Sequence, residues 1–328
     1  MLAATPESAI SIMEKLLNVL TSVPFIILAS VAATIFLCTL YVHFRGKARL
    51  RFERQLTEHS GWLSPLNCLF YMFSAVPKDP ILPVEMFPEL APIKENWKVL
   101  QEEAQALWDA GKIEYRDEHM DLAFLAFKKL GWKRFYLNWY HDYFPSALES
   151  CPKTIEIIRN IPGLNAAAFT MLPPGGHLGK HRDPLASALR YHLTLVSPND
   201  PGCRLFVDGE PVVWMEGEAF VFDETYVHWA ENTTDKPRIV FFADFTRPLH
   251  PGPVRWLNNF LVRYVYGMTR SRNELSESEG LFGKVTPLLH VLKKFFRGIK
   301  ERVNRKAYYT VKYILFSGLL FLLLRSFA

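Results

Sequence analysis

The residues with the clearest chemical potential lie in the segment 177–184 (HLGKHRDP), which brings imidazoles and a carboxylate close together. In an extended segment His181 and Asp183 point to the same side, because side chains alternate along a strand. A second imidazole, His228, follows in a later apolar segment. Two histidines and one carboxylate suit iron(II) and leave coordination positions open. The sequence therefore predicts a metal site formed by His181, Asp183 and His228.

An arginine follows ten positions after this histidine, in the apolar run 238–244 (RIVFFAD). A guanidinium at that place can hold a carboxylate through two parallel hydrogen bonds, so we expect Arg238 to bind an anion beside the metal. His177 is harder to assign. H-x-x-x-H would bind a metal on a helix, but the preceding Pro-Pro-Gly-Gly disfavours a helix. His177 is thus a candidate for the substrate pocket or for a supporting contact to a metal ligand.

These residues give the chain a resemblance to the 2-oxoglutarate- and iron-dependent oxygenases. Within them it resembles the aspartyl/asparaginyl β-hydroxylase family and its bacterial lipid A 2-hydroxylase branch. The resemblance covers residues 132–248, and its motifs are specific as an ordered set. That set comprises Thr170, His177, His181, Asp183, Arg190-Tyr191-His192, Gly217, Phe222-Asp223, His228 and Arg238.

The resemblance implies roles for these residues. It implies that iron is bound by His181, Asp183 and His228. It implies that 2-oxoglutarate is held by Arg190, His192 and Arg238, with Thr170 as a further contact. The cofactors would be Fe(II), 2-oxoglutarate as cosubstrate and dioxygen, and no side chain would be needed as a general acid or base. Animal members have glycine at the position of Asp183, so the full ligand set is typical of the bacterial branch.

Arg190 and His192 alternate on one face of the apolar segment 189–196. A buried charge must be paired. A carboxylate of 2-oxoglutarate would pair Arg190, and so would an acid of the protein such as Asp223 or Asp244. The sequence leaves both pairings open.

The elements that position these residues are predicted to be short strands separated by turns. Strands are expected at 166–172, 189–196, 203–207, 210–215, 219–222, 228–230 and 238–245, with a turn at Asp208-Gly209, after first strands within 132–143. A helix is predicted from Pro92 to Gly111 and another over 154–159. This pattern predicts a sandwich or barrel, and the resemblance implies an α+β fold with a double-stranded β-helix (jelly-roll) oxygenase core, flanking helices and terminal transmembrane helices.

The N-terminal region has no charged side chain from Leu16 to Val42, and its densest part, 23–42, is long enough to span a bilayer. A cleaved signal peptide or a buried core helix fits this pattern less well. The basic cluster that follows predicts, by the positive-inside rule, that the N-terminus lies outside and the catalytic domain in the cytoplasm. The expected location is the bacterial inner membrane.

The predicted organisation has five parts: a transmembrane anchor (1–44), a basic juxtamembrane connector (45–83), the oxygenase domain with flanking helices (84–250), a basic amphipathic helical segment (251–310) and a C-terminal membrane segment (311–328). The net charge of +5 comes from the basic residues of 45–54 and 284–312, because the rest of the chain is acidic. Basic segments beside apolar ones predict an anionic membrane as partner rather than nucleic acid. The basic helix within 285–300 would lie on the membrane or pack on the domain.

Three functions are compatible with the sequence. The first is a membrane-bound hydroxylase of an acyl chain of lipid A or its precursor, the second a peptidyl aspartyl/asparaginyl β-hydroxylase, and the third an inactive membrane scaffold. The complete set of His181, Asp183, His228 and Arg238 disfavours the scaffold. The basic and apolar flanks favour the lipid substrate, which carries phosphates that attract Lys and Arg.

Overall fold

The computed structural model describes residues 21–113, 132–140, 142–281 and 283–284. The chain divides into two compact units, Met1–Cys38 with Leu288–Ala328, and Thr39–Pro287. The described part of the first unit, residues 21–38, lies almost wholly in helix α2 (Val23–Phe44), whose last residues lie in the second unit. The predicted C-terminal membrane segment and the amphipathic helix within 285–300 lie outside the described residues.

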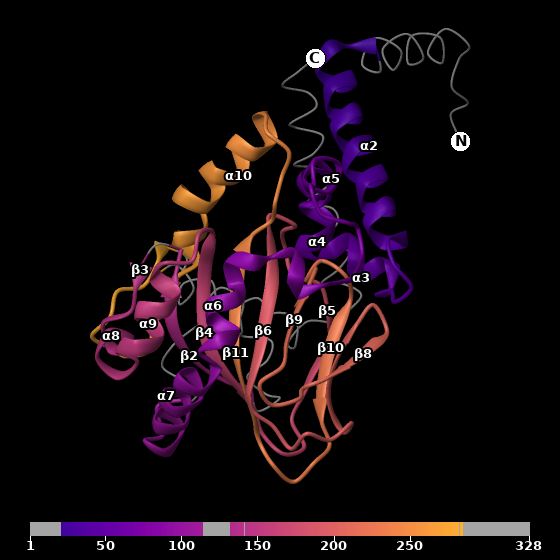
Figure 1. Ribbon diagram of the computed structural model, residues 1–328. Helices are drawn as coiled ribbons and strands as arrows, with labels where there is room; N and C mark the ends of the chain where they lie inside the picture. Colours follow the sequence, from indigo (N-terminus) through magenta and orange to yellow (C-terminus); the bar gives the residue numbers. More distant parts are fainter. Residues whose placement is uncertain (1–20, 114–131, 141, 282, 285–328) are drawn as a thin grey trace, which may run out of the picture. The chain divides into compact units, whose positions relative to one another are not determined.

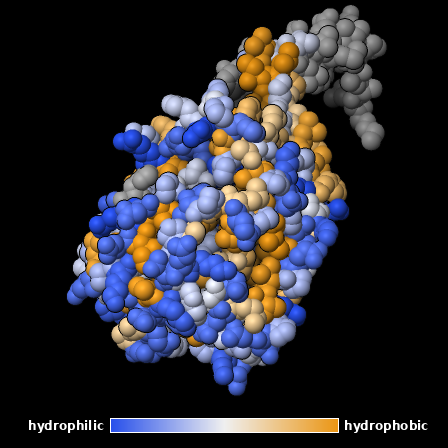
Figure 2. Space-filling view, viewed as in Figure 1, coloured by the Kyte–Doolittle hydropathy of each residue, from blue (hydrophilic) through white to orange (hydrophobic). Residues whose placement is uncertain are grey.

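Helix α2 is long and apolar enough to cross a membrane, judged by length and composition, and it is the one such helix in the described ranges. Its apolar side chains are largely exposed: Val23 exposes 69% of its surface, Ile27 59% and Leu37 63%. In Figure 2, hydrophobic residues lie along this helix. A helix that is apolar but not buried in a protein core has the surface that a lipid environment requires.

The described residues form two antiparallel sheets, and the larger has the strand order β1-β9-β6-β11-β4-β2-β3 (Figure 1). Its long central strands are β4 (Leu164–Leu172), β6 (Ala188–Val196) and β11 (Arg238–Thr246). Residues on both faces of these strands are buried, which explains their nearly continuous apolar sequence. The outer strands are β1 (Ile81–Leu82), β9 (Ala219–Phe222), β2 (Lys133–Trp139) and β3 (Asp142–Tyr143).

The smaller sheet has the order β5-β10-β7-β8. It consists of β5 (His177–His181), β10 (His228–Asn232), β7 (Cys203–Val207) and β8 (Glu210–Val213). A cavity lined by residues of both sheets lies between them. Two antiparallel sheets that face each other in this way give the sandwich that the strand pattern predicted, with the jelly-roll-like form that the resemblance implied.

Helices cover the large sheet. The predicted helix 92–111 is divided at Asn96 into α6 (Ala91–Glu95) and α7 (Trp97–Asp109), and the helix predicted at 154–159 begins earlier, as α9 (Pro152–Arg159). The apolar sides of α7 and α9 enter the same core as the large sheet. Short elements complete this layer: η1 (Val84–Met86), η2 (Pro88–Leu90) and α8 (Pro145–Ser150).

The segment 45–83, predicted as a connector, contains α3 (Phe52–Thr57), α4 (His59–Trp62) and α5 (Ser64–Met72). After the sheets come α10 (Pro253–Tyr264) and the short helix η4 (Tyr266–Thr269). A second, smaller apolar cluster joins Val42 at the end of α2 with Phe70 and Tyr71 of α5 and Val254 of α10. The segment is therefore packed on the domain.

The strand predictions agree closely with the structure. The strands predicted at 203–207 and 219–222 have the same bounds, and the others differ by at most two residues at either end. The predicted turn at Asp208-Gly209 is present, with positive φ at both residues (54° and 93°), which suits a tight hairpin. Strand β5, predicted only as an extended segment, pairs with β10.

Candidate metal and anion site

The three predicted metal ligands come together between the sheets. His181 ends β5 and His228 begins β10, and the two residues lie directly opposite each other across the antiparallel pair. Their ring centroids are 4.1 Å apart, and Nε2 of His181 is 3.7 Å from Oδ1 of Asp183. One ligand atom from each of the three residues lies within 4.8 Å of the others. This spacing allows one ion to contact all three.

Both imidazoles are oriented by the backbone. Nδ1 of His181 donates to the carbonyl of Gly179 at 2.7 Å, and Nδ1 of His228 donates to the carbonyl of Tyr226 at 3.0 Å. With the proton on Nδ1, Nε2 of each ring keeps its lone pair for a metal. Burial lowers the pKa of His181, and burial together with His181 lowers the pKa of His228 to about 3. Both rings are therefore neutral near pH 7, as metal ligands must be.

A tight turn before β10 sets the position of His228. Oδ1 of Asp223 accepts a hydrogen bond from the backbone N–H of Thr225 at 3.0 Å. Oδ2 of the same carboxylate pairs with Arg45 at 2.7 Å and with Arg247 at 2.8 Å. The Arg45 guanidinium also lies 3.8 Å from the ring centroid of Tyr71. Arg45, counted in the sequence among the basic residues beside the membrane, is thus buried in the folded domain.

Arg190 is enclosed by acids of the protein. Its guanidinium contacts Asp183 at 2.5 Å and Asp244 at 2.9 Å, and it also pairs with Glu224. Asp244 lies directly opposite Arg190 across β6 and β11, which explains the pair. Of the two pairings left open by the sequence, the structure shows the one with Asp244, whereas Asp223 pairs elsewhere.

The charges of Arg190 and of the acids around it determine which of these acids is protonated. Burial would raise the pKa of Asp183, but the Arg190 charge outweighs burial and holds that pKa below its usual range. Burial raises the pKa of Glu224 well above its usual range, and the charges of Asp244 and Asp183 add to this. Glu224 therefore keeps a proton to higher pH than Asp183 does, and an ionised Asp183 is the state that binds a cation.

Arg238, at the start of β11, is also buried but has no acid beside it among the described residues. Its Nη1 contacts Oγ1 of Thr170 at 3.3 Å and the Thr170 carbonyl at 3.4 Å, and its Nε has no hydrogen-bond partner. The guanidinium carbon lies 3.9 Å from the ring centroid of Trp214. Burial lowers the pKa of Arg238 to about 10, so the side chain still carries its charge at pH 7. A buried cation with free donors favours an anionic ligand.

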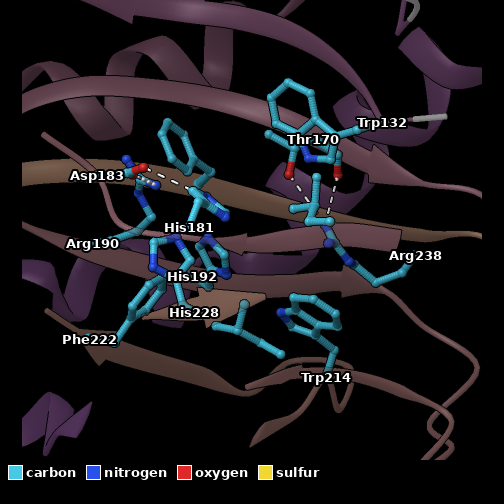
Figure 3. A pocket seen from close by; sticks show the side chains of 13 residues that line it. Trp132, Thr170, His181, Asp183, Arg190, His192, Trp214, Phe222, His228 and Arg238 are labelled. Atoms are coloured by element: carbon cyan, nitrogen blue, oxygen red, sulfur yellow. Dashed lines mark hydrogen bonds and ion pairs between the residues drawn. The ribbon is translucent and has the colours of Figure 1, made fainter. Parts of the chain in front are cut away.

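His192 lines the cavity that contains both Arg238 and the metal-ligand group (Figure 3). Burial and the charge of Arg238 lower the pKa of His192 well below its usual value, so the ring is neutral. Its Nδ1 is buried without a hydrogen-bond partner. The predicted residues Thr170, His181, Asp183, Arg190, His192, His228 and Arg238 all line this cavity.

Sequence reasoning missed two contributors to the site and left one residue unassigned. Trp214 is fully buried under Arg238, and Glu224 is buried beside Arg190. Trp214 lies within the strand predicted at 210–215 and Glu224 just after the one predicted at 219–222, but neither position by itself indicates a contact with an arginine. His177 is exposed at the start of β5, where it lies opposite Glu231 in the strand register, and it does not line the cavity.

Comparison with known proteins identifies the family of this chain. The family model described as aspartyl/asparaginyl beta-hydroxylase matches residues 94–248. An ornithine lipid ester-linked acyl 2-hydroxylase from Rhizobium tropici is 32% identical over 218 residues, which are 65% of this chain and 74% of that protein. The chain belongs to the aspartyl/asparaginyl beta-hydroxylase family. The resemblance expected from the sequence is thereby confirmed.

Other relatives match a smaller share of their length. The human aspartyl/asparaginyl beta-hydroxylase is 27% identical over 161 residues, which are 48% of this chain and 21% of the human protein. Among solved structures, a Pseudomonas putida prolyl-4-hydroxylase matches with a TM-score of 0.30 and 19% identity, covering 47% of this chain and 87% of that one. A similarity at that level carries no argument about function.

Proposed function

We propose that this protein is a membrane-bound hydroxylase that uses Fe(II), 2-oxoglutarate and dioxygen to hydroxylate an acyl chain of a membrane lipid. One observation carries the proposal: a cavity that holds a His-His-Asp group also holds Arg238, a buried guanidinium with no acid beside it in the described part of the chain. A metal and a dicarboxylate are the two ligands that this pair of features would bind together.

The residues fit these two ligands. Nε2 of His181, Nε2 of His228 and a carboxylate oxygen of Asp183 would hold the iron, which with 2-oxoglutarate would supply the activation of dioxygen. Arg238, with Thr170 beside it, would clamp a carboxylate of 2-oxoglutarate. The neutral His192 and the ring of Trp214 would line the space beside that clamp and exclude water. Arg190 would act indirectly, by holding Asp183 in place.

Lipid A is the first candidate substrate, with addition of the hydroxyl to carbon 2 of an acyl chain. Helix α2 supports a lipid substrate because it has the length and composition of a membrane span. The relative that acts on an acyl chain, the ornithine lipid enzyme of Rhizobium tropici, supports it as well. That relative also makes the acyl chain of an ornithine lipid a second candidate. A peptidyl Asp or Asn, after which the human relative is named, is the third.

The proposed location is the bacterial inner membrane, with the catalytic domain on the cytoplasmic side. A reporter fused to the N-terminus should then be detected in the periplasm, and the domain should resist protease added to intact spheroplasts. Digestion of the domain from outside would contradict this placement.

Expression in a Gram-negative host that lacks the modification tests the substrate. Lipid A should become one oxygen heavier, with the oxygen on an acyl chain rather than on the sugar, and His181→Ala should abolish the gain. Ornithine lipids are measured in the same extracts from a host that makes them. An added oxygen on ornithine lipid alone would select the second candidate. Unchanged lipids together with a hydroxylated peptide Asp or Asn would contradict the lipid proposal.

A further inference from the structure

Helix α10 exposes a row of aromatic side chains. Trp256, Phe260 and Tyr264 are spaced by four residues and therefore lie on one side of the helix. They expose 68%, 42% and 59% of their surface. Their rings contact one another, with centroids 5.8 Å apart for Trp256 and Phe260 and 5.2 Å for Phe260 and Tyr264. We call these three residues the aromatic row.

A polar row lies beside the aromatic row. Arg255, Asn259 and Arg263 are all exposed, and no acidic residue occurs in α10. Arg263 lies over the ring of Tyr264, with its guanidinium carbon 5.6 Å from the ring centroid. The exposed side of α10 thus combines amphipathic aromatic rings with cations, which is the chemistry that binds an anionic lipid headgroup region.

The buried side of α10 connects this surface to the end of α2. Val254 and Leu261 pack in the small apolar cluster that also contains Val42, near the end of α2, and Phe70 of α5. Helix α5 in turn exposes Leu69 and Met72. Val42 belongs to the last turns of the helix with the composition of a membrane span, so the apolar cluster under α10 includes a residue of that helix.

Helices α5 and α10 also hold the segment that follows the metal ligand Asp183. The amide of Asn67 in α5 donates to the carbonyl of Pro184 at 3.0 Å and accepts from the N–H of Ala186 at 2.8 Å. The amide of Asn258 in α10 donates to the carbonyl of Ser187 at 3.1 Å. This segment leads directly into β6, which carries Arg190. A surface that binds lipid through α10 would therefore be rigidly connected to the metal site.

We propose that the aromatic row of α10, with Arg255 and Arg263, docks the catalytic domain on an anionic bilayer surface and so orients the metal site towards the membrane. This inference rests on the membrane association in the proposed function. It assigns the contact to side chains of α10, which are distinct in the sequence from α2 and from the basic clusters at 45–54 and 284–312. A flexible tether would leave the domain free to turn, whereas docking through α10 fixes one face.

A fluorescence experiment on the full chain tests the docking. Phe260→Cys and the control Met215→Cys, both at positions that are 42% exposed, are each made with Cys38→Ala and Cys68→Ala. The single accessible cysteine is labelled with a fluorophore. The protein is reconstituted into vesicles of phosphatidylcholine, with or without phosphatidylglycerol, and lipids bearing a nitroxide on the acyl chain serve as quenchers.

The proposal predicts that the label at 260 is quenched, and more strongly with phosphatidylglycerol, while the label at 215 is not. Equal quenching at the two positions would overturn it. If the label at 260 is instead shielded to an extent that depends on protein concentration and not on lipid, a second copy of the chain covers the aromatic row. That result would also overturn the proposal. Neither readout requires iron or turnover. A failure of the hydroxylase proposal would therefore leave this result intact.

A kinetic measurement links the docking to turnover. The triple variant Trp256→Ser, Phe260→Ser and Tyr264→Ser should lose about tenfold or more of its rate on substrate in anionic vesicles, because docking contributes apolar burial there. Its rate on substrate dispersed in detergent should match that of the wild type, which also shows that the variant is folded. An unchanged rate in vesicles would contradict the proposal.

Discussion

Two arginines line the same cavity and differ in what surrounds their charge. Arg190 contacts three acids, Asp183, Glu224 and Asp244, which satisfy its guanidinium within the protein. Arg238 contacts Thr170 and the face of Trp214 instead, and no acid balances its charge among the described residues. Position in the sheet causes the difference, since Arg190 lies opposite Asp244 and Arg238 lies opposite Leu172.

This difference separates a structural charge from a binding charge. The ion pairs of a paired arginine stabilise the folded domain, and they leave few of its hydrogen-bond donors for a ligand. An unpaired buried arginine costs free energy until an anion arrives, and the anion recovers that cost on binding. The two residues should therefore respond in opposite ways to the same substitution.

The largest expected effect is the loss of turnover on removal of one imidazole. His181→Ala or His228→Ala should abolish hydroxylation and weaken iron binding without unfolding the domain, because the remaining ligands cannot hold the ion in place. Product formation and bound iron in the purified variants check this. Normal activity in either variant would remove the metal assignment. Asp183→Ala is expected to keep at most residual activity, and a wild-type rate there would show that the carboxylate is not a ligand.

The next effect separates the two arginines by stability. Arg190→Met should destabilise the metal-free protein by about 3–5 kcal/mol, since it leaves buried acids without a cation. Arg238→Met removes an unpaired charge and replaces it with an apolar chain of similar length, so it should be neutral or stabilising. Thermal unfolding of both full-length variants in the same detergent measures the difference. Equal destabilisation by the two substitutions would contradict the comparison.

A smaller effect is expected in the pH dependence of the stability of the folded protein. The folded pKa of His228 is about 3 and that of His192 is also depressed, whereas both return to ordinary values near 6.5 in the unfolded chain. The unfolded state binds more protons between these values, so stability is present above about pH 6.5 and falls as pH decreases towards 3. The loss should be on the order of 1 kcal/mol per pH unit for each ring. Thermal midpoints of the metal-free protein at several pH values measure it, and His228→Gln should reduce the slope.

Sequence alone predicted much of the strand layout, and the metal and anion ligands that it proposed line one cavity in the structure. The strands were predictable because they are short apolar runs bounded by Gly, Pro, Asn and Asp, as at Asp208-Gly209. His181, Asp183, His228 and Arg238 could be named because their types and order suit one chemistry. The prediction of one continuous helix over 92–111 was wrong, since the helix is interrupted at Asn96.

The sequence alone could not predict which residues the charged side chains contact. Strand register decides that Arg190 meets Asp244 rather than Asp223, and register depends on pairing between segments that lie more than fifty residues apart. For the same reason, nothing in the basic run 45–54 shows that Arg45 is buried against Asp223 while Arg51 stays exposed. Trp214 was not predicted because its contact with Arg238 joins residues that are distant in the sequence.

Binding of 2-oxoglutarate to the iron-loaded protein without oxygen tests the central claim most directly, by calorimetry on the wild type and on Arg238→Met. The wild type should bind one molecule per chain and should require iron to do so. In Arg238→Met the loss of a buried charge-assisted pair, on the order of 2–5 kcal/mol, should weaken binding roughly thirtyfold or more. Iron affinity should stay nearly constant. Unchanged 2-oxoglutarate affinity in Arg238→Met would contradict the account, because the unpaired arginine would then not be the residue that holds the anion.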